Sequence, residues 1–497
     1  MAFQPLINYA LHQKLLAPED AVYCENLLAA LYHFDAPGAL CEALPAGTEG
    51  AALGVLLDAY TDLALQRGIM PEDTVTQRDL FAAKLMGMLT PPPSQINRCF
   101  ATLYRESPKA ATDWFYGICC ANGYIQQERI AKNVQWDTPT EYGDLHITIN
   151  LSKPEKDPKA IAAAAVAQPV GYPSCQLCVE NVGYAGRLDH PARQNLRIVP
   201  YTSAGEQWGL QYSPYAYYPQ HCIALNSLHT PMKIDRKCFT QLLDFVGKFP
   251  HYFIGSNADL PIVGGSILSH AHFQGGLDCF PMTAAPIVQT VQIAGFADIR
   301  CGIVDWPMSV LRISGEDPER LAALADVILQ AWRGYTDADM HLFAETDGVP
   351  HHTITPIARR RGAAYEMDLV LRDNHTTAEH PMGVYHPHRQ LHHIKKENIG
   401  LSEVMGLAVL PARLKTELEQ LKHLLQTGGD LRADEATVKH ADWVEQWLPH
   451  YPAIPDYDAV LRNEVGKVFL QVMTHCGVYP RTEQGLRSFL RFIASVK

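Results

Sequence analysis

The order of apolar and polar residues divides the chain into a helical first part and a mixed remainder. Between residue 8 and about residue 110, apolar residues recur every three or four positions, which predicts helices. Three prolines at residues 91–93 end one of these helices, because proline cannot continue helical hydrogen bonding. Near Asp144 the pattern changes to the alternation that is typical of β-strands.

From residue 145 onward we expect short strands separated by helices. The expected strands are residues 145–150, 209–212, 222–225, 261–263, 287–293, 309–313 and 368–372. The expected helices are residues 238–249, 319–335 and 414–426, with further helices between 457 and 496. Two glycines at residues 428–429 are a common stop signal for the third of these.

The length and net charge of the chain bear on the number of domains and on the kinds of ligand that we expect. A chain of 497 residues is too long for one simple core. Its net charge of −12 argues against general affinity for nucleic acid or an anionic membrane. An anionic substrate would therefore need local basic residues, and three arginines at 359–361 and the pair Lys395-Lys396 are candidates. Taken alone, the arginine run is interpreted as a solvated charge cluster.

The first residues and the spacing of the cysteines indicate whether the protein is secreted or stays in the cytoplasm. Residues 1–5 lack the basic region and apolar stretch of a signal peptide. The twelve cysteines do not have the dense spacing of a secreted disulfide scaffold. We therefore expect a reduced, cytoplasmic protein in which most cysteines are buried small apolar residues.

The segment Ser269-His-Ala-His-Phe-Gln-Gly-Gly276 contains the most informative chemistry. If it is extended, His270, His272 and Gln274 point to one face, because side chains alternate along a strand. One imidazole can bind a metal, the other can attack phosphorus, and the carboxamide can donate to a phosphoryl oxygen. Glycines on both sides are expected to let a bulky substrate approach the backbone.

A Cys-x-x-Cys pair, Cys175 and Cys178, can supply half of a tetrahedral zinc site. No second pair follows, so histidines such as His229 and His270 would have to complete it. Redox and core roles for the two cysteines stay open. A histidine whose nitrogen binds zinc cannot attack through that nitrogen, so one histidine of the His-x-His must be a ligand and the other free.

Residues 380–400 contain the densest run of histidines, with His386 and His393 near its middle. This segment can bind a second metal, contact phosphate, or form polar surface. Contact between Lys396 and a phosphate or sugar is the favoured interpretation. Signatures of nucleotide-binding P-loops, dinucleotide-binding folds and serine hydrolases are absent.

Several motifs together resemble a known family. The Cys175–Cys178 pair, the segment from Cys222 to His229, and residues 265–274 look like those of galactose-1-phosphate uridylyltransferases, members of the histidine-triad superfamily. Residues 78–94 and 392–411 resemble its longer bacterial branch, the UDP-glucose–hexose-1-phosphate uridylyltransferases. The likeness runs from about residue 20 to 430.

The resemblance implies a ping-pong transfer of UMP between UDP-glucose and galactose 1-phosphate. In this family the residue matching His272 is the nucleophile, and the residue matching Gln274 donates to a phosphoryl oxygen. Related hydrolases have a third histidine at that position, which protonates a poor leaving group. A sugar phosphate needs little protonation, so glutamine suits transfer better than hydrolysis.

The resemblance also implies ligands and contacts. It assigns a structural zinc site to Cys175, Cys178, His229 and His270. It assigns substrate contacts to Asn257, Ser269, Lys396, Ile399 and Gly400. The chain departs from the better-known branch at Ala271, which is proline there, and at Leu401-Ser402, which replace its sugar-binding Tyr-Glu pair. Hexose specificity, the identity of the metal and a second metal near His386–His393 are left undetermined.

We therefore expect an α+β fold of histidine-triad-like mixed or antiparallel sheets in two related halves flanked by helices. The expected segments are a helical N-terminal segment (1–140), a catalytic half with the zinc site (141–280), a second half (281–430) and a helical C-terminal segment (431–497). The family implies a homodimer. The alternatives are a dinucleoside polyphosphate phosphorylase-like transferase and a non-catalytic, zinc-stabilised binding protein.

Overall fold

The computed structural model describes residues 3–34, 50–152, 171–265 and 267–497. These residues form two compact units. Unit 1 comprises Met1–Lys132, Ser152–Ala216 and Gln220–Thr230, and unit 2 comprises Asn133–Leu151, Tyr217–Pro219 and Pro231–Lys497. The segment boundaries expected from the sequence stay predictions.

Unit 1 is mainly helical, as its apolar periodicity predicts. Its helices are α1 (Gln4–His12), α2 (Ala21–Leu31), α3 (Leu53–Gln66), α4 (Val75–Leu89), α5 (Pro93–Glu106), α6 (Pro108–Ala121) and the short α7 (Gln127–Ile130). Strands β3 (Val199–Ser203), β4 (Glu206–Tyr212) and β5 (Cys222–Asn226) pair antiparallel. The proline run does end α4, and Pro93 also begins α5, a position where a missing N–H costs nothing.

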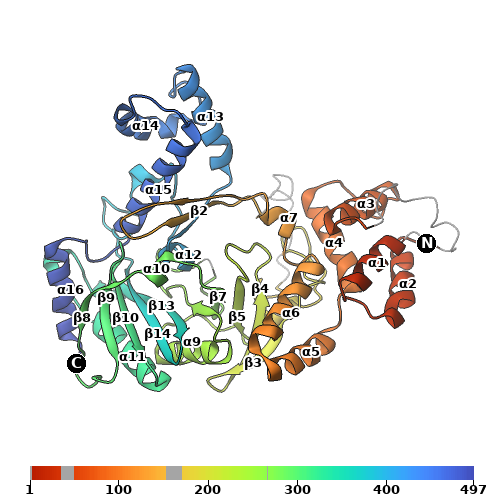
Figure 1. The fold of residues 1–497 in the computed structure, drawn as a ribbon, viewed down its shortest axis with the longest axis horizontal. Helices are drawn as coiled ribbons and strands as arrows, with labels where there is room; N and C mark the ends of the chain where they lie inside the picture. Colours follow the sequence, from red (N-terminus) through yellow and green to blue (C-terminus); the bar gives the residue numbers. More distant parts are fainter. Residues whose placement is uncertain (1–2, 35–49, 153–170, 266) are drawn as a thin grey trace. The chain divides into compact units, whose positions relative to one another are not determined.

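Unit 2 contains a large antiparallel sheet in the order β7-β6-β13-β14-β10-β9-β8. Its strands are β6 (Phe253–Gly255), β7 (His272–Gly276), β8 (Ile287–Val291), β9 (Arg300–Val304), β10 (Val310–Gly315), β13 (His352–Arg361) and β14 (Ala364–Asp373). Helices α9 (Arg236–Lys248) and α11 (Pro318–Arg333) pack against β13, and α11 also packs against β10 and β14 (Figure 1).

A smaller sheet and the C-terminal helices complete unit 2. The sheet pairs β1 (Val134–Thr138) with β2 (Leu145–Ile149) antiparallel, and β2 with β15 (Leu407–Leu410) parallel. The remaining elements are the hairpin β11–β12 (Glu345–Thr346, Val349–Pro350) and helices α10 (Pro281–Ala284), α12 (Leu401–Val404), α13 (Arg413–Thr427), α14 (Ala441–Trp447), α15 (Tyr457–His475) and α16 (Glu483–Ser495). An apolar core joins the two sheets and α15, with Phe253, Ile147 and Phe469 fully buried. The predicted α+β class with antiparallel sheets is confirmed.

Two local predictions are wrong for identifiable reasons. Residues 261–263 form a turn instead of a strand: Ile262 has φ +73° and Val263 N–H donates to the Pro261 carbonyl at 2.8 Å. The arginine run lies on the unpredicted strand β13, and Arg359 is buried against the Asp368 carboxylate at 2.8 Å. Pro356 concealed that strand, since proline argues against a central position in a sheet.

Among the described residues, none of the helices is both long enough and apolar enough to cross a bilayer.

A buried pair of imidazoles makes the stability of unit 2 depend on pH. His393 Nδ1 and His440 Nδ1 lie 2.9 Å apart, and His440 Nε2 lies 3.1 Å from a Glu417 carboxylate oxygen. The carboxylate accepts from His440 Nε2, so His440 Nδ1 accepts from His393 and both rings are neutral. Burial, followed by repulsion from His440, lowers the pKa of His393 to about 3.

We predict that His393→Asn flattens the fall in stability between pH 7 and pH 5. The unfolded imidazole takes up a proton below about pH 6.5, whereas the folded one stays neutral until about pH 3. The wild type therefore has its full stability above pH 6.5 and loses on the order of 2 kcal/mol by pH 5 through this residue. Urea unfolding midpoints at the two pH values measure the effect. His423→Asn, on the exposed face of α13, is the control and should leave the pH dependence unchanged.

Candidate functional site

His272 begins β7 and is fixed by its own backbone neighbour. The side chain is buried, with 6% of its surface exposed. Its Nδ1 lies 2.8 Å from the His270 carbonyl oxygen (a group that can only accept), so Nδ1 carries the proton. The lone pair of the neutral ring therefore resides on Nε2. Burial lowers the pKa of His272 below its usual value, which favours this neutral form.

His270 does not share the strand with His272. It lies in a bend, and β7 begins two residues later, so the expected single face carries His272 and Gln274 but not His270. The bend turns the His270 carbonyl toward the ring of His272. Gln274 is half-buried on β7, opposite Gly255 of β6. Ser269 is exposed in the same bend.

The glycines around this segment serve close packing of the chain. A Cβ on Gly275 would lie 2.4 Å from the Phe253 carbonyl oxygen, and one on Gly265 would lie 2.7 Å from Asn257 Nδ2. Both distances are too short for a side chain. These two glycines are therefore needed for close packing of the chain, and the expected approach of a substrate along this backbone stays a prediction.

Asn257 and the segment from Ile399 to Leu401 lie together although they are far apart in sequence. Asn257 Oδ1 accepts from Leu401 N–H at 2.9 Å, and a Cβ on Gly400 would lie 3.2 Å from the same oxygen. Arg372, buried on β14, donates to the Ile399 carbonyl at 3.0 Å. The structure therefore brings together three of the sequence-predicted substrate-contacting residues.

Sequence reasoning missed Arg372 and Glu403, which fix this backbone. Glu403 accepts from Gly400 N–H at 3.1 Å and from Lys395 Nζ at 2.9 Å. Glu403 is the third residue of α12, where glutamate commonly caps a helix, but the residue before the helix is Gly400 instead of the serine or threonine that makes this signal recognisable in a sequence. Lys395, a candidate for substrate contact, is instead buried and also donates to the Val409 carbonyl. Lys396 is exposed on the same segment.

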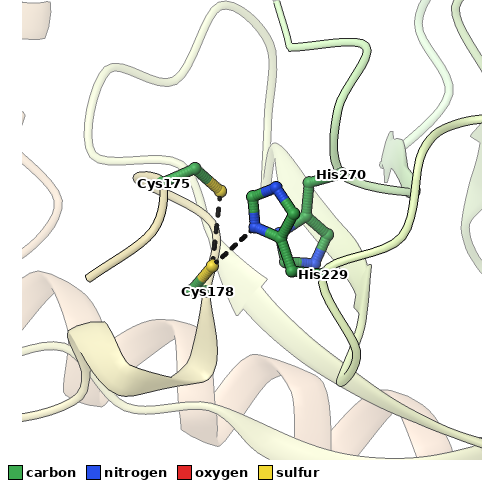
Figure 2. Close-up of side chains that lie close together, drawn as sticks. All are labelled: Cys175, Cys178, His229 and His270. Atoms are coloured by element: carbon green, nitrogen blue, oxygen red, sulfur yellow. Dashed lines mark hydrogen bonds between the residues drawn. The ribbon is translucent and has the colours of Figure 1, made fainter. Parts of the chain in front are cut away.

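Four side chains form a cluster suited to a metal ion. The ligand atoms of Cys175, Cys178, His229 and His270 lie within 4.8 Å of one another (Figure 2). The two Sγ atoms are 3.5 Å apart, and Cys178 Sγ is 3.0 Å from His229 Nδ1. Ligand atoms in a tetrahedral zinc site are roughly 3.3–3.8 Å apart, so these distances fit an ion with little rearrangement.

The surroundings of the cysteines support this interpretation. Asn181 Nδ2 donates to the carbonyls of Cys175 and Cys178, both at 2.8 Å, which fixes the loop. Burial and the hydrogen bond between the Cys178 thiol and Cys175 Sγ raise the pKa of Cys178 to about 11. A cation is therefore needed to hold both sulfurs as thiolates, and a set of two thiolates and two imidazoles is typical of structural zinc.

The histidines of residues 380–393 bond mainly to protein groups. His388 Nε2 donates to the Val384 carbonyl and His392 Nε2 to the Pro387 carbonyl, and His386 Nε2 lies 3.2 Å from Asn398 Oδ1. In the part of the chain that the structure describes, no second group of three or more metal-ligating side chains is close enough to hold an ion.

Comparisons with known proteins identify the family of this chain. The N-terminal domain of galactose-1-phosphate uridyl transferase matches residues 51–231, and the C-terminal domain of that family matches residues 245–444. A galactose-1-phosphate uridylyltransferase of Clostridium acetobutylicum is 49% identical over 493 residues, 98% of each chain. Enzymes with the same name from Latilactobacillus sakei and Streptococcus pneumoniae are 50% and 52% identical. They cover 96% and 86% of this chain, and 95% and 86% of their own.

Among solved structures, yeast Ap4A phosphorylase Apa2 superposes with a TM-score of 0.31 and 13% identity, over 61% of this chain and 89% of that one. That score is too low to bear on the fold. The sequence relatives alone decide the family: the chain belongs to the galactose-1-phosphate uridylyltransferases.

Proposed function

We propose that the protein exchanges UMP between UDP-glucose and galactose 1-phosphate through a covalent intermediate on His272. The observation that carries this proposal is the hydrogen bond from His272 Nδ1 to the His270 carbonyl, which leaves Nε2 as the nucleophile. The names of relatives about half identical to this chain support the two substrates.

In the first step, Nε2 of His272 attacks the α-phosphorus of the UDP-hexose. An N–P bond forms, and the P–O bond to hexose 1-phosphate breaks with its electron pair on the leaving oxygen. Neutral imidazole needs no base for this attack. The ring becomes positively charged, and its proton stays on Nδ1, hydrogen-bonded to the His270 carbonyl oxygen. In the second step, a phosphate oxygen of the other hexose 1-phosphate displaces the imidazole and forms the new UDP-hexose.

Gln274 is proposed to stabilise the transition state of both steps. It lies two residues after His272 on β7, so its side chain extends from the same face of the strand. An amide N–H there can donate to a phosphoryl oxygen as negative charge grows on it. One such donor is worth about 3 kcal/mol of transition-state stabilisation.

The hexose phosphate is proposed to bind where Asn257 meets the segment of Ile399 and Gly400. The bonds from Arg372, Glu403 and Asn257 hold this backbone rigid, and rigid groups lose little entropy when they bind a ligand. Lys396 and Ser269, both exposed, are proposed to contact the phosphate groups.

We propose that Cys175, Cys178, His229 and His270 hold a structural zinc ion. The ion would neutralise the two thiolates and fix the His270 side chain. Because the carbonyl of the same residue accepts from His272, fixing His270 orients the nucleophile as well. A homodimer in the cytoplasm, as expected from the family, completes the proposal.

Labelling tests the covalent step. UDP-glucose labelled at the α-phosphate should leave acid-labile, base-stable label on His272, located by peptide mapping. His272→Asn should take up none, and His251→Asn, a matched histidine on unit 2, should label normally. Label on any other residue would contradict the mechanism.

Exchange of label between UDP-glucose and glucose 1-phosphate, with no second sugar present, separates this reaction from single displacement and from non-catalytic binding.

Replacing Gln274 tests its part in the chemistry. Gln274→Ala should lower kcat about 100-fold for transfer, because one donor to the developing charge is lost. The KM for UDP-glucose should change less than kcat, since the bond strengthens in the transition state. Steady-state kinetics measure both constants, and an unchanged kcat would remove Gln274 from the mechanism.

Removal of one thiolate tests the metal. Cys178→Ser should reduce bound zinc from about one ion per chain to a small fraction and lower the melting temperature at the same time. Elemental analysis and thermal unfolding provide the two measurements. Cys99→Ser, a partly exposed cysteine outside the cluster, should keep both values. Full zinc content in the Cys178 variant would refute the ligand assignment.

A further inference from the structure

A polar pocket lies in unit 2, beside the end of β7 that is opposite to His272. It encloses about 280 Å³ and is lined by the start of β6, the chain after β7, and the end of β13. The lining side chains include His251, Cys279, Thr283 and all three residues of the arginine run, 359–361.

The register of the sheet separates this pocket from His272. Phe253 pairs with Gly276 at the pocket end, and Gly255 pairs with Gln274 nearer the catalytic end. From His272 to Gly276 the strand advances about 13 Å, and the lining residues begin only beyond Gly276. The residues proposed to contact the substrate are not among those that line the pocket.

Arg359 supplies the pocket with a buried donor. Only 3% of this residue is exposed. Its Nη1 donates to Glu366 and Asp368, both at 2.8 Å, and its Nε lies 3.2 Å from an Asp278 carboxylate oxygen. Within the described residues, its Nη2 has no hydrogen-bond partner. A buried N–H group without an acceptor costs on the order of 1–3 kcal/mol, so this position favours a bound acceptor.

The two neighbouring arginines are held at the mouth of the same pocket. Arg360 lies 3.8 Å over the Tyr365 ring and donates to the Ala363 carbonyl at 2.8 Å. Arg361 donates to the Thr283 carbonyl at 2.6 Å and to Glu366 at 3.2 Å, and half of its side chain is exposed. Their orientations are therefore set before any ligand arrives, while half of the Arg361 side chain remains exposed.

Carboxylates in this region are already engaged by protein donors. Asp278 accepts from Thr283 Oγ1 and Phe280 N–H through one oxygen, and its other oxygen faces Arg359. Asp368 is paired with Arg312 as well as with Arg359. Arg312, Arg359 and Arg361 thus pair with three carboxylates (Asp278, Glu366 and Asp368), so Arg360, which bonds to carbonyls, adds one positive charge in excess.

We propose that this pocket is a second anion site that binds a phosphate group, as inorganic phosphate or as a phosphate monoester. A tetrahedral oxyanion accepts from several donors at once, which matches the unpartnered Arg359 Nη2 and the half-exposed guanidinium of Arg361. The volume is close to the lower end of ligand pockets, about 300–1,000 Å³, and admits a phosphate with a small organic group.

Cys279 offers a local probe, since it is an exposed residue in the pocket lining. Burial, followed by the Asp278 charge, raises the pKa of its thiol to about 11, so alkylation is followed at alkaline pH. Inorganic phosphate and a hexose 1-phosphate, added separately, should slow alkylation of Cys279 by iodoacetamide, measured by peptide mass spectrometry. Alkylation of Cys99 provides the internal reference. Stronger protection by the hexose 1-phosphate identifies a phosphate monoester as the ligand, and equal protection identifies phosphate itself. Equal protection by potassium chloride at the same ionic strength overturns the proposal.

Variants locate the effect. Arg361→Gln should raise the phosphate concentration for half-protection about tenfold, the loss expected for one charge-assisted hydrogen bond. Arg360→Gln provides a second test if the first variant is unstable. Arg320→Gln is the matched control, because Arg320 is an exposed arginine on α11 that pairs with Asp298. It should change the phosphate concentration for half-protection less than about twofold. Unchanged protection in both pocket variants overturns the proposal.

Discussion

The proposed chemistry depends on a single hydrogen bond between His272 Nδ1 and the carbonyl oxygen two residues earlier in the chain. That bond decides which ring nitrogen carries the proton and therefore which one can attack phosphorus. It requires the backbone to bend at His270 before β7 begins. After the bend, β7 pairs closely with β6, which the glycine at position 275 allows by leaving room for the Phe253 carbonyl.

A second constraint acts on the backbone proposed to meet the hexose phosphate. Side chains from three separate elements bond to residues 399–401: Asn257 after β6, Arg372 on β14 and Glu403 on α12. Burying such groups costs desolvation, but once satisfied they give the segment one conformation. Both halves of the proposed site are therefore built from main-chain groups that side chains hold in place.

Buried ion pairs of arginine lie at the end of the large sheet of unit 2 that is away from His272. Arg359 and Arg312 share the fully buried Asp368, and their charges are balanced inside the sheet. The acidic net charge of the chain therefore says little about local affinity for anions, because basic groups concentrate in this one region. The strands β6 and β7 connect this region with His272, the proposed nucleophile.

The sequence by itself determined the N-terminal helices, six of the strands (β2, β4, β5, β8, β10 and β14) and the short motif around His272, because these depend on local periodicity and on residues adjacent in the chain. Through its resemblance to a family it also indicated Cys175, Cys178, His229 and His270, which do lie together. Only the tertiary structure decided the burial of Arg359, the engagement of Lys395 by Glu403, and the turn at Ile262. The physical reason is that burial and ion pairing are set by partners distant in sequence, such as Asp278 for Arg359, and no local pattern records which residues folding will bring together.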